Sequence, residues 1–228
     1  FAAKGTADLE GPLQVQFSAQ GIDAGILGKL AGIDAKVRGS VNLDAQLGGT
    51  MAEPAADLSV AIMNGGAGTA MFDSLTGIFN LRQGIIEVNQ FVVKKLLNQQ
   101  EYKVSAAGKI PLAALDANAD ELDRKDQFDL TLSLDHADLS ILPILSKNVD
   151  WAVGATKGSL RITGTRSQPL FNGALSLSDG AMKFKQLAHP ITDMNVYAVF
   201  SGTHFSLDKC KGPRGPGNFF HPGHQGRL

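Results

Sequence analysis

The chain has few of the features that cross-link a protein by disulfides, give it a large net charge or anchor it in a membrane. Its 228 residues include one cysteine, Cys210, so no disulfide can form within the chain, and cysteine usage says little about the compartment. Basic and acidic residues nearly cancel, 21 against 22, and no basic face emerges, which argues against nucleic acid as a partner. No apolar run approaches the roughly 18–20 residues that cross a bilayer.

The sequence also lacks an initiator methionine and a signal peptide, since it opens on FAAKGTADL in a strand-like pattern. We therefore expect a piece from the middle or end of a longer polypeptide. Its hydrophobic content of 43% is ample for a core, which excludes a disordered chain. A length of 228 residues could form one or two domains.

An internal repeat is the most informative feature that is present. The motif Gly-Thr-x-x-x-Pro occurs at 49–54 and again at 164–169, an offset of 115 residues. Ten residues after each proline comes a turn-forming pair, Asn-Gly at 64–65 and Asp-Gly at 179–180. Each motif follows a Gly-Ser-apolar-x-apolar strand, GSVNL or GSLRI. A repeat of strands and tight turns predicts an array that grows by adding strands.

Apolar and polar residues alternate along many short segments, which is typical of strands with one dry face. The Asn-Gly and Asp-Gly pairs favour type I′ hairpin turns, because both central positions need positive φ. Two segments, Asp23–Leu30 and Asp138–Leu145, have spacings compatible with one or two helical turns. The prediction is an all-β protein, an antiparallel multi-strand meander curled into an open U-shaped groove with one or two short helices. About sixteen strands at roughly 4.8 Å would span about 75 Å.

Four parts of the chain are distinguished. Residues 1–115 form a first β-groove unit, 116–129 a polar linker loop, and 130–210 a second unit. Residues 211–228 hold prolines and glycines without alternation. We hypothesise that a frameshift near Cys210 produced this anomalous tail.

The order of these motifs resembles the TamB family, within the wider AsmA-like group of repeating β-groove proteins. The resemblance covers Gly5 to about Cys210. It is carried by HADLSILPIL, GSLRITGTRSQPLFNGALSLSDGAM and FSL in the second unit, and by GSVNLDAQLGGTMAEPAADLSVAIMNGG and LTGIFNLRQGIIEV in the first. The chain departs from the family at its end, where the anomalous tail replaces a further domain.

The resemblance implies a location and a task. The location is the periplasm of a Gram-negative-type bacterium, with an inner-membrane anchor in an N-terminal segment outside this sequence. The fold would be a long sheet curled into a trough with an apolar inner face. The task would be to conduct phospholipid between inner and outer membranes. The family also assists outer-membrane protein assembly, with a barrel partner of the Omp85 type.

We expect phospholipid acyl chains to be the ligand of the apolar face, with no catalysis, cofactor or metal. A dry trough suits acyl chains because their burial is favourable by about 0.8 kcal/mol per CH₂, while headgroups stay in solvent. The residues expected to line it are Val41, Leu43, Leu47, Leu58, Val60, Ile62, Leu132, Leu160, Ile162, Leu175, Leu177, Phe200 and Phe205.

Other interpretations remain open. Alternating strands also make ordinary closed sandwiches or barrels. One alternative is a scaffold whose strand edges template outer-membrane β-proteins by β-augmentation. Another is a structural β-rich surface segment with a closed core.

Two apparent metal sites are discounted. Asp116, Asn118 and Asp120 imitate the start of a calcium loop, but Glu121 replaces the required glycine. The histidines of HPGH lie in the anomalous tail.

Overall fold

The computed structural model describes residues 2–6, 14–30, 37–50, 52–67, 70–97, 99–115, 127–139, 148–165, 167–211 and 224–227. Nearly all of them lie in strands. The strands are β1 (Ala2–Thr6), β2 (Gln14–Asp23), β3 (Val37–Gly49), β4 (Pro54–Ala67), β5 (Ala70–Arg82), β6 (Ile85–Leu97), β7 (Gln100–Pro111), β8 (Phe128–Asp138), β9 (Val149–Gly164), β10 (Pro169–Phe184), β11 (Ile191–Gly202), β12 (His204–Lys211) and β13 (His224–Arg227). The helices are α1 (Ala24–Leu30) and the 3₁₀ turn η1 (Leu112–Leu115).

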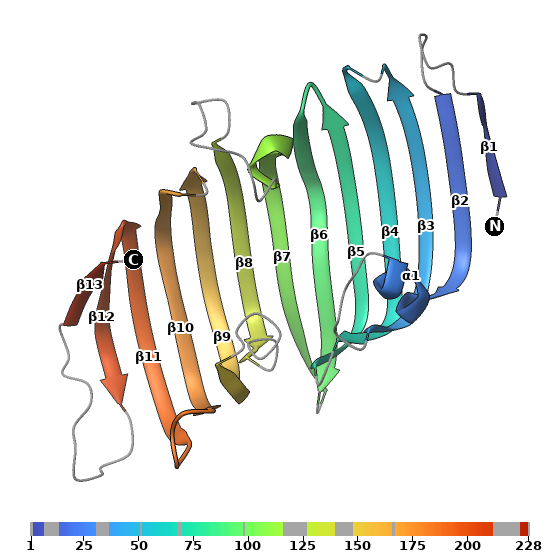
Figure 1. Cartoon of the computed structure of the whole chain (residues 1–228). Coiled ribbons are helices and arrows are strands. Elements are labelled where there is room, and N and C mark those ends of the chain that lie inside the picture. Colours follow the sequence, from blue (N-terminus) through green and yellow to red (C-terminus); the bar gives the residue numbers. More distant parts are fainter. Residues whose placement is uncertain are drawn as a thin grey trace.

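The strands form one sheet in which each strand pairs with its neighbours in sequence, in the order β1 to β13. Every pairing is antiparallel, so the topology is an uninterrupted meander (Figure 1). The chain termini lie at opposite ends of the molecule (Figure 1). The predicted all-β meander is confirmed. The described sheet has thirteen strands rather than about sixteen, and twelve spacings of about 4.8 Å make it about 58 Å wide rather than 75 Å.

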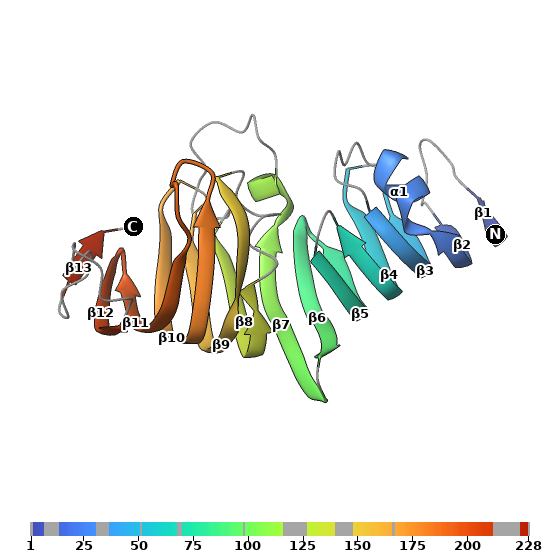
Figure 2. The ribbon, with the colours of Figure 1, turned by 90° about the horizontal axis from the view of Figure 1, so that it is seen from below.

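The sheet curls into an open groove (Figure 2), with β6 and β7 at its bottom and α1 and η1 on its open side. Glycines in three of the central strands permit this bend. Gly108, Gly158 and Gly173 have φ of 143°, 140° and 143°, a conformation that other residues rarely adopt. A Cβ at Gly158 would also collide with the carbonyl oxygen of Ala174 on the adjoining strand. Glycine at these positions lets neighbouring backbones approach where the sheet turns.

Helix α1 is the one α-helix among the described residues, and it follows β2 directly. The Asp23 carboxylate accepts a 2.7 Å hydrogen bond from the backbone N–H of Gly25, as a helix N-cap does. Ala24 packs in a buried cluster with Ile22 and Val41, so α1 lies against the apolar side of the sheet. This confirms the predicted helix at Asp23–Leu30. The second predicted helix, at 138–145, lies largely outside the described residues.

The sequence repeat is also a structural repeat. The β3–β4 hairpin turn is closed by Thr50, whose Oγ1 accepts a hydrogen bond from the N–H of Glu53 at 3.0 Å. The β9–β10 turn is closed in the same way, with Thr165 Oγ1 accepting from the N–H of Gln168 at 3.2 Å. Both turns follow a glycine with positive φ, Gly49 at 81° and its counterpart in β9 at 90°.

The Asn-Gly and Asp-Gly pairs are not hairpin turns, contrary to the sequence prediction. Asn64 lies inside β4 and Asp179 inside β10, each with φ of 50°. The register shifts opposite or beside these residues, between Arg38 and Ser40 on β3 and after Leu177 on β10. One left-handed residue followed by glycine also suits a β-bulge, which bends the strand without ending it.

The boundaries expected for the linker and for the tail can be compared with the strands of the structure. Strand β8 begins at Phe128, inside the expected linker 116–129, whose residues 116–126 lie outside the described part. The sheet runs without a break from β7 to β8. In the anomalous tail, His224–Arg227 forms strand β13, whereas no strand pattern was expected there. Residues 212–223 lie outside the described part, and the frameshift hypothesis stays a prediction.

Candidate functional site

Three rows of apolar side chains cross the sheet on one side, here called the apolar face. Residues paired across antiparallel strands share a face, so the rows follow directly from the register. The first row is Ala19, Leu43, Val60, Gly77, Phe91, Ala106, Leu132, Leu160, Gly173, Phe200 and Phe205. The second row is Phe17, Ala45, Leu58, Phe79, Val88, Gly108, Leu130, Ile162, Phe171 and Gly202. The third row is Ile22, Val41, Ile62, Leu75, Val93, Val104, Leu134, Gly158, Leu175, Ala198 and Leu207.

Every position of the three rows is apolar or glycine. The first and third rows run from β2 to β12, so ten spacings of about 4.8 Å make them about 48 Å long. Because α1 packs on this face and lies on the open side of the sheet, the apolar face is the inner face of the groove (Figure 2).

All thirteen residues predicted to line the trough lie on the apolar face. Eleven belong to the three rows, and two flank them. Leu47 pairs with Val15 and Ala56 beside the second row, and Leu177 pairs with Thr156 and Val196 beside the third. The structure therefore brings these residues to one surface.

Strand β6 contributes apolar-face residues that the sequence prediction missed. Val88 and Phe91 both face the groove although they are three positions apart, an odd spacing that places residues of a regular strand on opposite faces. A register shift between them marks a β-bulge at Asn89 and Gln90. A strict period of two therefore fails along this strand, and a search that allows one inserted residue would have found it.

The apolar face has little cover. Val41, beneath α1, is 3% exposed, and Leu160 on β9 is 7% exposed. Leu47 on β3, by contrast, is 47% exposed. Among the described residues no large side chain is completely enclosed. The accessible surface of the chain is 15056 Å², against about 9,900 Å² expected for a globular monomer of 24.0 kDa. The described residues form a single sheet with no second sheet on its apolar side, and such an open layer exposes more surface than a globular core does.

Polar groups on the apolar face are few and lie at its margins. The Thr156 hydroxyl is buried and donates a 2.8 Å hydrogen bond to the carbonyl oxygen of Ala137, so it is satisfied. Lys95 pairs in register with Tyr102 near the end of the β6–β7 hairpin, at the edge of the groove. The three rows themselves carry no charge, so nothing in them selects a charged group.

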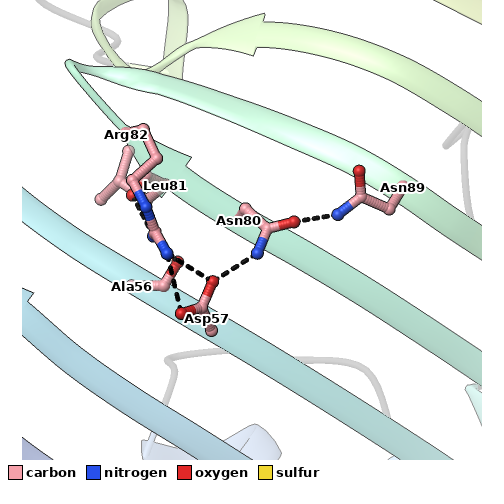
Figure 3. A network of polar contacts seen from close by, with 6 residues as sticks. All are labelled: Ala56, Asp57, Asn80, Leu81, Arg82 and Asn89. Carbon is pink, nitrogen blue, oxygen red and sulfur yellow. Dashed lines mark hydrogen bonds and ion pairs between the residues drawn. The ribbon is translucent and has the colours of Figure 1, made fainter.

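The outer face of the sheet is polar and includes a network across β4, β5 and β6 (Figure 3). Arg82 forms a two-pronged ion pair with Asp57, both contacts at 2.8 Å, and also donates to the carbonyl oxygen of Ala56. Asn80 links Asp57 to Asn89 by side-chain hydrogen bonds. The Arg82 guanidinium and then the Asn80 amide lower the pKa of the Asp57 carboxyl.

A second polar row continues across β6 to β9. Glu87 pairs with Lys109 at 2.9 Å and raises the pKa of that amine, and Arg161 pairs with Asp129 at 2.7 Å and lowers the pKa of that carboxyl. A carboxyl pKa lowered by folding stabilises the fold above the unfolded pKa, and this contribution is lost as the pH falls through the folded value. These pairs are exposed, so each adds little stability and serves mainly to fix register.

Two hollows of the described surface are lined mostly by residues outside the apolar rows. One, of about 210 Å³, is lined mainly by outer-face residues of β6–β8, including Ser105, Thr131 and Ser133. The other, of about 460 Å³, lies at the strand ends around Thr165 and Gln168. Neither hollow is lined by a charged side chain, and the exposed lining of each is more apolar than polar. The apolar rows extend farther across the sheet than either hollow.

Comparison with protein-family models, with curated proteins and with solved structures found no match. Two further findings concern the described ranges alone. They contain no cluster of three or more His, Cys, Asp or Glu placed to hold a metal ion. Neither of their helices has the length and apolar character needed to span a membrane.

Proposed function

We propose that the chain is a non-enzymatic segment of a conduit in which phospholipid acyl chains lie along the apolar face. The observation that carries the proposal is the continuity of the three apolar rows from β2 to β11 or β12, on a face over which the described part of the chain places no second sheet. Exposed apolar surface of this extent marks a binding surface in a soluble fold. Burying a methylene group on it is favourable by about 0.8 kcal/mol.

The composition of the rows favours movement over tight capture. Leu, Val, Ile and Phe recur along each row, so neighbouring sites offer an acyl chain similar contacts. No charged residue interrupts the rows, and beyond α1 no described element covers the groove, so a headgroup keeps its water. A chain can then slide from one strand to the next without a deep energy minimum.

The motif order that resembles the TamB family supports the same task. A periplasmic location, an anchor in the inner membrane and a barrel partner in the outer membrane belong to this proposal. The alternative of a structural β-rich surface segment with a closed core has less support, because the described strands form one open sheet.

Photo-cross-linking tests the proposal at two adjacent residues of β8. Leu132 faces the groove, while Thr131 faces outward and pairs with Ala107 and Arg161. A photoreactive amino acid at 132 should yield phospholipid adducts by mass analysis after incubation with phospholipid vesicles. The same group at 131 should yield at least tenfold fewer. Equal yields at the two positions, or no lipid adduct at 132, would contradict the proposal.

A scaffold for outer-membrane β-protein assembly is the second candidate, and the open edges of the sheet favour it. Within the described sheet β1 and β13 each pair on one side only, and an unpaired strand edge is the kind of surface that β-augmentation uses. The two functions respond to different changes. A charge in the rows, such as Leu43→Arg, should impair lipid binding most, whereas Lys4→Pro in β1 should impair assembly assistance most.

A further inference from the structure

Helix α1 occupies part of the face on which acyl chains are proposed to lie. It packs on the open side of the sheet (Figure 2). Ala19 and Val41, 2% and 3% exposed, have the least exposed apolar side chains of the three rows. They form one buried cluster with Ile22 and with Ala24 of α1. While α1 is docked, a ligand therefore cannot contact the first row on β2 or the third row on β2 and β3.

The second row is not closed in this way on the same two strands. Phe17 and Ala45 are partly exposed, and Leu47 beside them is 47% exposed. The helix thus narrows the groove at β2 and β3 without sealing it. An acyl chain that crosses these strands while α1 is docked has the side of the second row alone to lie on.

Two glycines bring α1 close to the sheet. A Cβ built on Gly28 would lie 3.1 Å from Cγ2 and 3.3 Å from Cβ of Val37, the first residue of β3. A Cβ built on Gly25 would lie 3.1 Å from the carbonyl oxygen of the same valine. On another side of the helix, Ile26 is 57% exposed. The helix is therefore held mainly through the side that carries its glycines.

The helix can leave the sheet without breaking any strand pairing. The backbone ladder between β2 and β3 runs from the Val15–Leu47 pair to the Asp23–Ser40 pair, so the two strands are joined without α1. The helix has seven residues, and its two glycines lower its intrinsic helix propensity. Its docked state therefore depends on the apolar contacts beneath it.

The place that α1 covers has a counterpart in the second unit. Ile22 pairs with Val41, and the residues 115 positions further on, Ala137 and Thr156, pair with each other. A register shift adjoins both pairs, after Ala19 in the first unit and at the corresponding position in the second. All four residues of the two pairs are buried. A closed place at this point of the groove therefore recurs once in each unit.

We propose that α1 is a displaceable cover. Acyl chains reach Val41 and its neighbours only when the helix lifts, and a bound chain keeps it lifted. The proposal rests on the proposed lipid binding and adds a control on access to one part of the groove. The helix and an acyl chain bury the same side chains, so one can replace the other with little loss of apolar burial. A ligand that binds only the open form shifts the protein toward it, and its apparent affinity falls in proportion to the open fraction.

A redox-controlled tether tests the cover. The 3.3 Å between the Cβ built on Gly28 and that of Val37 is close to the roughly 3.5–4.5 Å that a disulfide requires. Gly28→Cys with Val37→Cys, in a Cys210→Ser background, should therefore form a disulfide that holds α1 on β3. Reduction releases the helix in the same protein, so each preparation is its own matched control. Titration of free thiols confirms the two states.

A photoreactive amino acid at 41 reports access beneath the helix, and one at 132 reports binding in the uncovered groove. With vesicles of phosphatidylethanolamine and phosphatidylglycerol, the reduced protein should give roughly tenfold more lipid adduct at 41 than the oxidised protein. Adduct at 132 should be equal in the two states. Equal adduct at 41 in both states, with adduct present at 132, would overturn the cover alone. No adduct at 132 in either state would overturn the proposed lipid binding and the cover with it.

The unaltered chain supplies a second measurement that does not depend on a substitution at the buried position 41. Addition of the same vesicles should speed hydrogen exchange of the α1 amides roughly threefold, because the bound chain displaces the helix. The β9–β10 hairpin should not exchange faster. Unchanged or slower exchange in α1, with adduct present at 132, overturns the proposal, because a helix that roofs a bound chain is protected by it.

Discussion

At the scale of single residues, glycine decides where the sheet can bend. Gly158 combines a φ of 140° with a neighbouring strand so close that a Cβ would collide with the carbonyl oxygen of Ala174. Gly84, in the β5–β6 turn, has a φ of 71° but open space around the position of a Cβ. Gly84 thus has a strained backbone only, whereas Gly158 has a strained backbone and a closely approaching neighbouring strand.

Gly158→Ala should therefore destabilise the protein by about 3 kcal/mol, since the strained φ alone costs about 1–3 kcal/mol and the collision adds to it. Gly84→Ala should cost only about 1 kcal/mol, because only the left-handed conformation is penalised. Urea unfolding followed by the fluorescence of Trp151 measures both. Equal losses in the two variants would show that the close approach at Gly158 contributes nothing.

At the scale of elements, α1 is the one α-helix of the described chain and it covers one end of the apolar face. The helix is seven residues long and depends on its cap and on the contact of Ala24 with Ile22 and Val41. So short a helix has little stability of its own. It should be among the first parts of the groove to open.

Asp23→Ala removes the hydrogen bond to the N–H of Gly25 and should weaken α1 by about 1 kcal/mol. Hydrogen exchange should speed up in α1 and at Val41 beneath it, while the β9–β10 hairpin keeps its protection. Gln20→Ala, an exposed change on β2, is the control and should leave both regions unaltered. Faster exchange across the whole sheet would mean that Asp23 supports more than α1.

Much of the element pattern can be predicted from the sequence, and the failures have physical causes. Alternation located β3, β4 and β8, and the run DAGILGKL located α1. The apolar residues of β6 were not predicted, because the bulge at Asn89 breaks the alternation of apolar and polar residues along this strand. Asn64 was predicted in a hairpin turn because left-handed residues serve turns and bulges alike, and only the register of the partner strand tells them apart.

The candidate site was predictable in its residues but not in its exposure. Alternation places Leu43 and Leu160 on one face whether that face is open or covered by a second sheet. Whether it is open depends on how the strands connect over the whole chain, and the structure settles this as a single open sheet. The bend itself depends on positive φ values at glycines such as Gly108, which local pattern does not predict.

At the scale of the whole molecule, the central claim is that one face of the open sheet is a surface for acyl chains. Nitroxide labels at four consecutive positions of β10 test it most directly, because Leu175 and Leu177 face the groove while Ala174 and Ser176 face outward. In a Cys210→Ser background, added phospholipid should shield the labels at 175 and 177 from a water-soluble relaxing agent and leave those at 174 and 176 accessible. Shielding at all four positions, or at none, would contradict the account.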